Sequence, residues 1–210
     1  SFSAIQHKMK FRIHKTEIII SYLIICIASV CIIAGAFDGF LYCLFAIIIH
    51  EAGHITTMCI FAYPPEKIKI SLFEISISDG KRQERNFIQN FLIIFFGPFS
   101  NFICFILFYL LYLIGNDFFL YPAAANLSVG LFNILPVMSL DGGQLLYLIL
   151  SRFFSDSVSQ SIVNVITFII IFPLAFFGFI LLFNSKYNFS LLIVCTYLVF
   201  SLICRNNKYY

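Results

Sequence analysis

Six long runs, almost free of charged residues, constrain the fold of this chain more than any other feature. Apart from Glu51 and Asp141 they contain no Asp, Glu, Lys or Arg, and they cover residues 18–37, 39–63, 87–116, 118–151, 157–185 and 187–204. About 20 apolar residues in a helix cross the roughly 30 Å hydrocarbon core of a bilayer. The runs are apolar on every face, whereas strands that span a membrane alternate apolar and polar residues. The sequence therefore predicts transmembrane helices.

The composition agrees with this interpretation. Apolar residues make up 61% and charged residues 11% of the chain, against about 45–50% and about 25% in soluble domains. We expect an all-α polytopic membrane protein, a single membrane-embedded domain over residues 1–210 without a PDZ or nucleotide-binding module. Its six transmembrane helices are predicted at about 17–37, 39–63, 87–115, 122–152, 158–184 and 188–204.

The basic residues predict the orientation of the helices. With six spans, all of the 13 Lys and Arg residues except Lys186 fall on one side of the membrane. The positive-inside rule makes that side cytoplasmic, with both termini there. The net charge of +3 then reflects topology, and nucleic acid is not an expected partner. A cleavable signal peptide ending near Ala34 is the alternative for the first helix, but its apolar run is longer than a usual signal core.

Three segments between or before the helices alternate apolar and polar residues with period two, which is typical of half-buried strands. They lie at about 8–15, 67–72 and 74–78. We predict that they form a small β-sheet at the membrane interface on the cytoplasmic side. Two interpretations of this sheet stay open. It either caps loop backbone at the membrane surface, or its edge receives an extended peptide by strand addition.

Four ionisable residues lie within the apolar runs: His50, Glu51, His54 and Asp141. Ionisable groups are costly there, at roughly 2.5–3.5 kcal/mol each for Asp, Lys or Arg at the centre of a membrane helix, so these residues are candidates for function. The first three form an H-E-x-x-H motif, in which the two imidazoles share one helix face and can bind one metal. Glu51 lies close enough around the helix to face a metal-bound water. The alternative is a polar cluster satisfied by neighbouring helices, as in a transporter.

Asp141 is the natural third ligand of such a metal. A catalytic zinc takes three protein ligands and an open fourth position, and Asp141 is the only other acid in any run. Asp141 and the middle of the H-E-x-x-H motif each lie 11 residues from the cytoplasmic end of their helix, or about 16 Å. Zinc with two neutral imidazoles, one carboxylate and ionised Glu51 also gives a neutral cluster, which a low-dielectric interior tolerates.

The residues before Asp141 predict a break in the helix. Pro136, Gly142 and Gly143 stand inside an apolar run, and proline removes an amide donor and clashes with the preceding turn. Irregular backbone at membrane depth is tolerated only where protein or a wet cavity covers it. A second kink is possible at Gly97-Pro98, and Pro173 is interpreted as a packing residue.

With these residues in place, the chain resembles the site-2 protease family of intramembrane zinc metalloproteases, and most closely its stage IV sporulation protein FB branch. The resemblance extends from about residue 11 to 154. It rests on three motifs: His50-Glu51-x-x-His54, Gly97-Pro98-x-x-Asn101, and Asn133-x-x-Pro136 leading to Leu140-Asp141-Gly142. Ser139 departs from the pattern, since relatives often carry proline there.

The resemblance implies a zinc-dependent endopeptidase with one zinc per chain. His50, His54 and Asp141 would bind the metal, Glu51 would be the general base, and Asn133 would contact the substrate backbone or the developing oxyanion. The implied partners are the lipid bilayer and a membrane-protein or membrane-associated peptide substrate that is cleaved in or near a transmembrane segment. A regulatory membrane partner is possible but not identified. The implied location is a bacterial cell membrane.

Two other functions are weighed against this one. The first is a catalytically silent relative that binds or sequesters membrane helices, against which the intact metal motif argues. The second is a metal transporter, which requires polar residues along a path to both faces. The first, fifth and sixth predicted helices offer few beyond Asn164 and Thr167, so the transporter ranks last.

Overall fold

A computed structural model describes residues 8–13, 16–21, 32, 35, 37–65, 67–70, 75–78 and 84–184. The chain divides into two compact units, Ser1–Leu131 and Phe132–Tyr210. Each unit is described by itself. Among the described residues, three helices are long and apolar enough to cross a membrane: Phe37–Ile60, Phe87–Leu113 and Asp156–Phe176. The chain is an integral membrane protein, and the six predicted spans stay a prediction.

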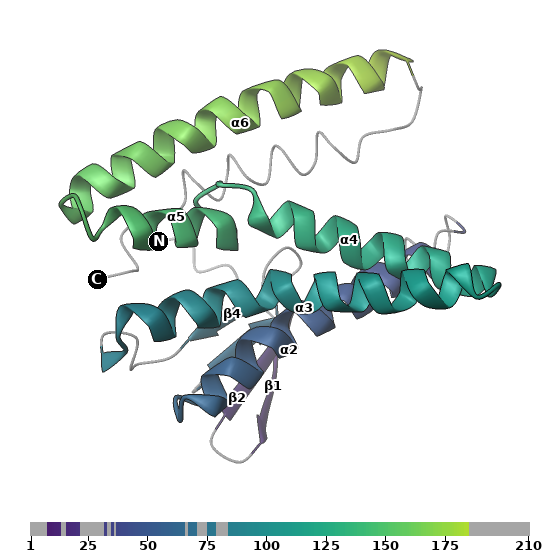
Figure 1. Ribbon diagram of the computed structural model, residues 1–210, viewed down its shortest axis with the longest axis horizontal. Coiled ribbons are helices and arrows are strands. Elements are labelled where there is room, and N and C mark those ends of the chain that lie inside the picture. Colours follow the sequence, from purple (N-terminus) through teal and green to yellow (C-terminus); the bar gives the residue numbers. More distant parts are fainter. Residues whose placement is uncertain are drawn as a thin grey trace. The chain divides into compact units, whose positions relative to one another are not determined.

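The first unit is built around two long helices that pack side by side, α2 (Phe37–Ile60) and α3 (Phe87–Leu113) (Figure 1). Asn86 starts α3 with a capping box, since its side chain accepts from the Gln89 backbone N–H and the Gln89 side chain accepts from the Asn86 backbone N–H. Pro98 stands within α3, and the helix runs through it without interruption. The short 3-10 helix η2 (Asp117–Phe119) then leads into α4 (Leu120–Ile134), whose last residues, 132–134, belong to the second unit.

A four-stranded sheet also belongs to the first unit. Its strands are β1 (Lys8–Ile13), β2 (Thr16–Ser21), β3 (Lys67–Ile70) and β4 (Ile75–Ser78), in the order β1-β2-β3-β4. The β1–β2 and β3–β4 pairs are antiparallel, and β2 pairs with β3 in parallel. Three of these strands coincide with the predicted segments 8–15, 67–72 and 74–78. Their position at the cytoplasmic interface stays a prediction.

The predicted first helix at 17–37 is wrong at its start, because strand β2 occupies residues 16–21. Residues 16–21 form a strand that pairs on both sides, so the helix does not begin at 17. The segment T-E-I-I-I-S is rich in β-branched residues, which favour strands when partner strands are present. Apolar character alone does not distinguish the two states. Most of the remaining predicted first helix, and all of the predicted helix 188–204, lie outside the described residues.

The second unit contains α5 (Asp141–Leu150) and α6 (Asp156–Asn184), which a short turn connects and which pack against each other (Figure 1). The predicted single helix 122–152 is therefore two helices, α4 and α5, with residues 135–140 between them. Proline disfavours helical conformation in the residue before it, which accounts for the end of α4 just ahead of Pro136. The core of this unit joins Val137 and Leu140 of the connecting loop to Ile171 of α6.

Candidate metal centre

His50 and His54 lie one turn apart on α2 and are buried, at 4% and 9% exposure. Their imidazole rings are nearly perpendicular, at 87°, with ring centroids 4.8 Å apart. The two Nε2 atoms are 3.2 Å apart. The i, i+4 spacing of the motif thus brings the predicted metal-binding atoms of α2 together.

The hydrogen bonds of the two Nδ1 atoms determine which ring nitrogens carry protons. His54 Nδ1 lies 2.7 Å from the Ile93 carbonyl oxygen, which only accepts, so this Nδ1 carries a hydrogen. His50 Nδ1 lies 2.9 Å from Asn101 Oδ1. The amide nitrogen of Asn101 donates elsewhere, to the Ala46 carbonyl, so Oδ1 is the acceptor and His50 Nδ1 is also a donor. In two neutral rings, both Nε2 atoms are then left with lone pairs.

This arrangement fits a tetrahedral zinc. Two neutral imidazoles with hydrogens on Nδ1 cannot hydrogen-bond to each other through Nε2, whereas a metal ion bound by both lone pairs would hold the two atoms at such a distance. With Zn–N bonds of about 2.0–2.1 Å, tetrahedral geometry places neighbouring ligand atoms roughly 3.3 Å apart. The observed Nε2–Nε2 distance of 3.2 Å is close to that value. A metal-ligating histidine typically donates its other ring N–H to a carbonyl or carboxylate, and both histidines donate to a carbonyl-type oxygen.

Gly97 of α3 provides the space for the rings. A Cβ atom added at Gly97 would overlap the imidazole of His54 and lie 3.0 Å from His50 Cε1. Gly53 of α2 has a similar role for the backbone, because a Cβ there would lie 2.7 Å from Ser100 Oγ and meet the Phe96 carbonyl. The sequence suggested a kink at Gly97-Pro98. The structure shows a close approach of the two helices at the histidine pair, and a kink at this position stays a prediction.

Asp141 is the first residue of α5 in the second unit, and it is 9% exposed. The preceding loop is anchored to α6, because the Met138 N–H donates to Thr167 Oγ1 at 2.9 Å and the Thr167 hydroxyl donates to the Val163 carbonyl at 2.8 Å. Gly142 and Gly143 let α5 pack directly on this loop. A Cβ at either position would overlap backbone atoms of residues 134–138.

The other predicted site residues are placed as follows. Glu51 follows His50 on α2 and is partly buried, and Asn133 is partly buried in the last turn of α4. The histidine pair and Glu51 belong to the first unit, whereas Asn133 and Asp141 belong to the second. Their joint action in one centre stays a prediction.

Sequence reasoning gave no role to Asn101 and did not single out Asn126. The signal was present, since an amide inside an apolar run needs partners.

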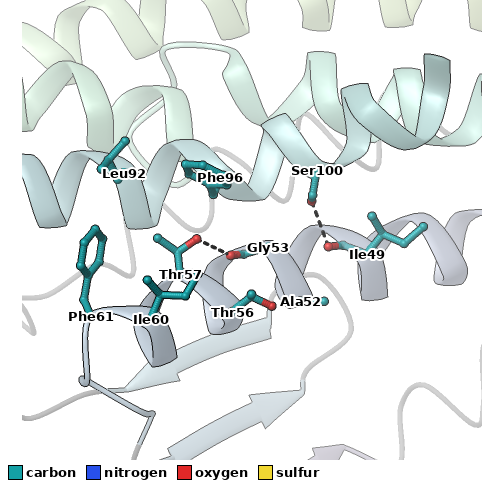
Figure 2. Close-up of a pocket in the computed structure, with 10 residues that line it drawn as sticks. All are labelled: Ile49, Ala52, Gly53, Thr56, Thr57, Ile60, Phe61, Leu92, Phe96 and Ser100. Atoms are coloured by element: carbon teal, nitrogen blue, oxygen red, sulfur yellow. Dashed lines mark hydrogen bonds between the residues drawn. The ribbon is translucent and has the colours of Figure 1, made fainter. Parts of the chain in front are cut away.

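A cavity of about 470 Å³ lies between α2 and α3. Figure 2 shows its lining side chains, with Thr57 donating to the Gly53 carbonyl and Ser100 donating to the Ile49 carbonyl. The lining residues are mostly apolar: Ile49, Ala52, Gly53, Thr56, Thr57, Ile60, Phe61, Leu92, Phe96 and Ser100. The histidines are not among them, so this cavity is distinct from the space between the two Nε2 atoms.

Three comparisons relate the chain to known proteins. Residues 115–177, which include Asn133 and Asp141, match the family model described as Peptidase family M50. Stage IV sporulation protein FB of Bacillus subtilis (strain 168) is 27% identical over 130 residues, which cover 60% of this chain. The chain spans 45% of the length of that relative.

The third comparison concerns the fold. The solved structure of a site-2 protease from Methanocaldococcus jannaschii matches with a TM-score of 0.69 at 20% identity, covering 92% of this chain and 93% of that one. The chain therefore has the site-2 protease fold. Together with the Peptidase family M50 match, this confirms the resemblance to the site-2 protease family that the motifs indicated.

Proposed function

We propose that this chain is a zinc-dependent intramembrane endopeptidase, which hydrolyses a peptide bond in or near a transmembrane segment of a membrane-associated substrate. The observation that carries the proposal is the histidine pair. His50 and His54 are buried on a helix that is long and apolar enough to span a membrane. Both Nδ1 atoms are occupied by oxygen acceptors, and the two Nε2 atoms face each other at 3.2 Å.

One zinc per chain would be held by His50, His54 and Asp141. Asp141 is the only acid of the apolar runs besides Glu51, and its predicted depth along its helix equals that of the histidines. The match of residues 115–177 to a peptidase family supports a functional rather than a packing role for this segment. When bound, zinc would supply a Lewis acid that polarises the scissile carbonyl and activates water.

The proton transfer is assigned to Glu51. Its carboxylate takes a proton from the attacking water and returns it to the leaving amine nitrogen. Glu51 directly follows His50 on α2 and is only partly buried, so it can face water beside the pair. The amide of Asn133 donates to the carbonyl oxygen of the substrate, where negative charge develops. Both assignments follow the motif resemblance.

The substrate class follows from the location of the site. Peptide bonds within a membrane helix are engaged in i→i−4 hydrogen bonds, so the substrate must unwind locally before hydrolysis. Substrates with Gly, Pro or Asn near the cytoplasmic end of their span are favoured, since these residues weaken helices. The unwound segment is extended, and an edge strand of the sheet, β1 or β4, would pair with it by strand addition.

The test separates metal binding from catalysis. The detergent-purified chain should contain about one zinc, and Asp141→Ala should reduce that content clearly. Glu51→Gln should keep the zinc and lose cleavage of a helical membrane substrate in liposomes. Absence of zinc in the well-folded parent, or equal cleavage by Glu51→Gln, would refute the proposal. Zinc without cleavage of any substrate in a panel would favour the silent relative that binds membrane helices.

A further inference from the structure

We infer that two buried amides, Asn101 of α3 and Asn126 of α4, form a hydrogen-bonded relay that sets the tautomer and orientation of His50. Asn101 is a positioning residue for His50, and Asn126 is a positioning residue for Asn101. The inference rests on the proposed function, because the zinc is the group to which His50 Nε2 is presented. Within the first unit, the relay connects His50 of α2 to residues of α3 and α4 by hydrogen bonds.

Asn101 is fully buried, and both hydrogens of its amide nitrogen and its amide oxygen have partners. Its nitrogen donates to the Ala46 carbonyl at 2.8 Å and to Asn126 Oδ1 at 3.0 Å. Its oxygen lies 2.9 Å from His50 Nδ1. A flipped amide would place its oxygen against two acceptors, so only one orientation satisfies the set. In that orientation His50 can only donate from Nδ1, and the lone pair is at Nε2.

Asn126 determines the orientation of Asn101 in the same manner. It is also fully buried, and its nitrogen donates to the Pro122 carbonyl one turn earlier in α4 at 2.9 Å. Its oxygen is therefore the atom that faces Asn101. The Pro122 carbonyl thus orients the Asn126 amide, which orients the Asn101 amide, which in turn orients the imidazole of His50. A buried network of this kind specifies one arrangement only if every member is satisfied.

The choice of amides instead of a carboxylate follows from charge. A carboxylate is a common partner for the second nitrogen of a metal-ligating histidine. Here the proposed centre already has two carboxylates, Glu51 and Asp141, against one divalent ion. A third buried carboxylate would leave net negative charge in an apolar span, which is costly. An amide oxygen accepts the Nδ1–H of His50 without adding charge.

The competing interpretation is that Asn101 only holds α2 and α3 together through the Ala46 carbonyl. The neighbouring residue provides a matched control. Ser100 Oγ donates to the Ile49 carbonyl of α2 at 3.0 Å, so it links the same two helices at the same level. The carbonyls of Ile49 and Gly97 accept from its hydroxyl, and neither of these hydrogen bonds involves a histidine. Loss of helix contact alone should therefore affect Ser100→Ala and Asn101→Leu alike.

The experiment measures zinc affinity by chelator competition on the full detergent-purified chain. We expect Asn101→Leu to bind zinc about 10–100-fold more weakly, the usual effect of losing such a partner. Asn126→Ala should weaken binding by a smaller factor, and Ser100→Ala should leave it unchanged. The double variant Asn101→Leu/Asn126→Ala should be no weaker than Asn101→Leu alone, because the two amides act in series. Circular dichroism and thermal unfolding monitor the fold of each variant.

A spectroscopic measurement distinguishes a change in the orientation of the metal ligands from a general loss of packing between the helices. The visible absorption bands of the Co²⁺-loaded chain report ligand geometry, and they should shift in Asn101→Leu but not in Ser100→Ala. Equal losses in Ser100→Ala and Asn101→Leu, or unchanged affinity in a folded Asn101→Leu, would overturn the relay. If Asn101→Leu does not fold, Asn126→Ala decides, and parental affinity there overturns the relay too. Absence of zinc from the parent refutes the proposed function instead.

Discussion

The two units hold their predicted metal ligands by different physical means. In the first unit, the Nδ1–H groups of the two histidines donate to the Ile93 carbonyl and to Asn101 Oδ1, and these hydrogen bonds fix the rings. In the second unit, Asp141 follows a loop whose shape depends on backbone atoms in contact with Gly142 and Gly143, and on one hydroxyl from Thr167. The first device is polar and directional, whereas the second is mainly steric. Substitutions in the two units should therefore fail in different ways.

The largest expected effect is in the steric device. Gly143→Ala places a Cβ onto the Val137 carbonyl, and because backbone cannot move aside cheaply, we expect about 3 kcal/mol or more of destabilisation. Thermal unfolding and zinc content measure the result, and both should fall. Gly39→Ala is the control, since nothing lies within 4 Å of a Cβ there. Parental stability in Gly143→Ala would contradict the steric account of the loop.

The next effect is at the hydrogen-bonded histidine pair of the first unit. Gly97→Ala places a methyl group onto the His54 imidazole, so the ring must leave its position beside His50. Alanine is a better helix former than glycine by about 1 kcal/mol, so α3 itself should not weaken. We expect zinc affinity to fall by at least about 100-fold with little change in helix content, because a metal ligand is displaced, whereas loss of a ligand's hydrogen-bond partner alone costs about 10–100-fold. Retained zinc affinity would show that the rings are not fixed against α3.

How much of the site follows from the sequence depends on the range of each interaction. The histidine spacing is local, and a helix repeat alone predicts that His50 and His54 share a face. The break before Asp141 is also local, because Pro136 and the glycines act on their own backbone. The tautomer of His50 depends on amides 51 and 76 residues away. The positions of those amides follow from the packing of α3 and α4, which no local pattern encodes.

The fold shows the same limit. Alternation marked three of the four strands, but β2 lacks alternation at Ile18–Ile20 and merges into an apolar run. Its pairing with β3 is a non-local event, because the partner residues, such as Glu17 and Lys67, are 50 positions apart in the sequence. The prediction of a single helix at 122–152 was wrong for the opposite reason. The apolar run is long enough for one span, but Pro136 interrupts the helix locally.

The hydroxyl that anchors the Asp141 loop gives a smaller effect. Thr167→Val removes the acceptor of the Met138 N–H and leaves that buried donor without it, at a cost of about 1–3 kcal/mol. Thr57→Val is the matched control, because the Thr57 hydroxyl donates to the Gly53 carbonyl of its own helix. Differential thermal unfolding should show the larger loss in Thr167→Val, with recovery in Thr167→Ser. Equal losses in the two valine variants would show that the Thr167 hydroxyl does not anchor the loop.

The smallest effect tests whether zinc affinity merely follows stability. Asn86→Ala removes the cap of α3 at a cost of about 1 kcal/mol. The capping hydrogen bonds join Asn86 to Gln89, far along the helix from Asn101, and do not involve a histidine. Unfolding temperature should fall slightly while zinc affinity and the Co²⁺ spectrum stay at parental values. This outcome, beside a large affinity loss in Asn101→Leu, would assign the difference to the hydrogen bond at Nδ1. A loss of affinity in Asn86→Ala in proportion to its loss of stability would instead mean that the histidine pair depends on the general rigidity of α3. The hydrogen bond from His50 Nδ1 to Asn101 would then have no separate effect on zinc affinity.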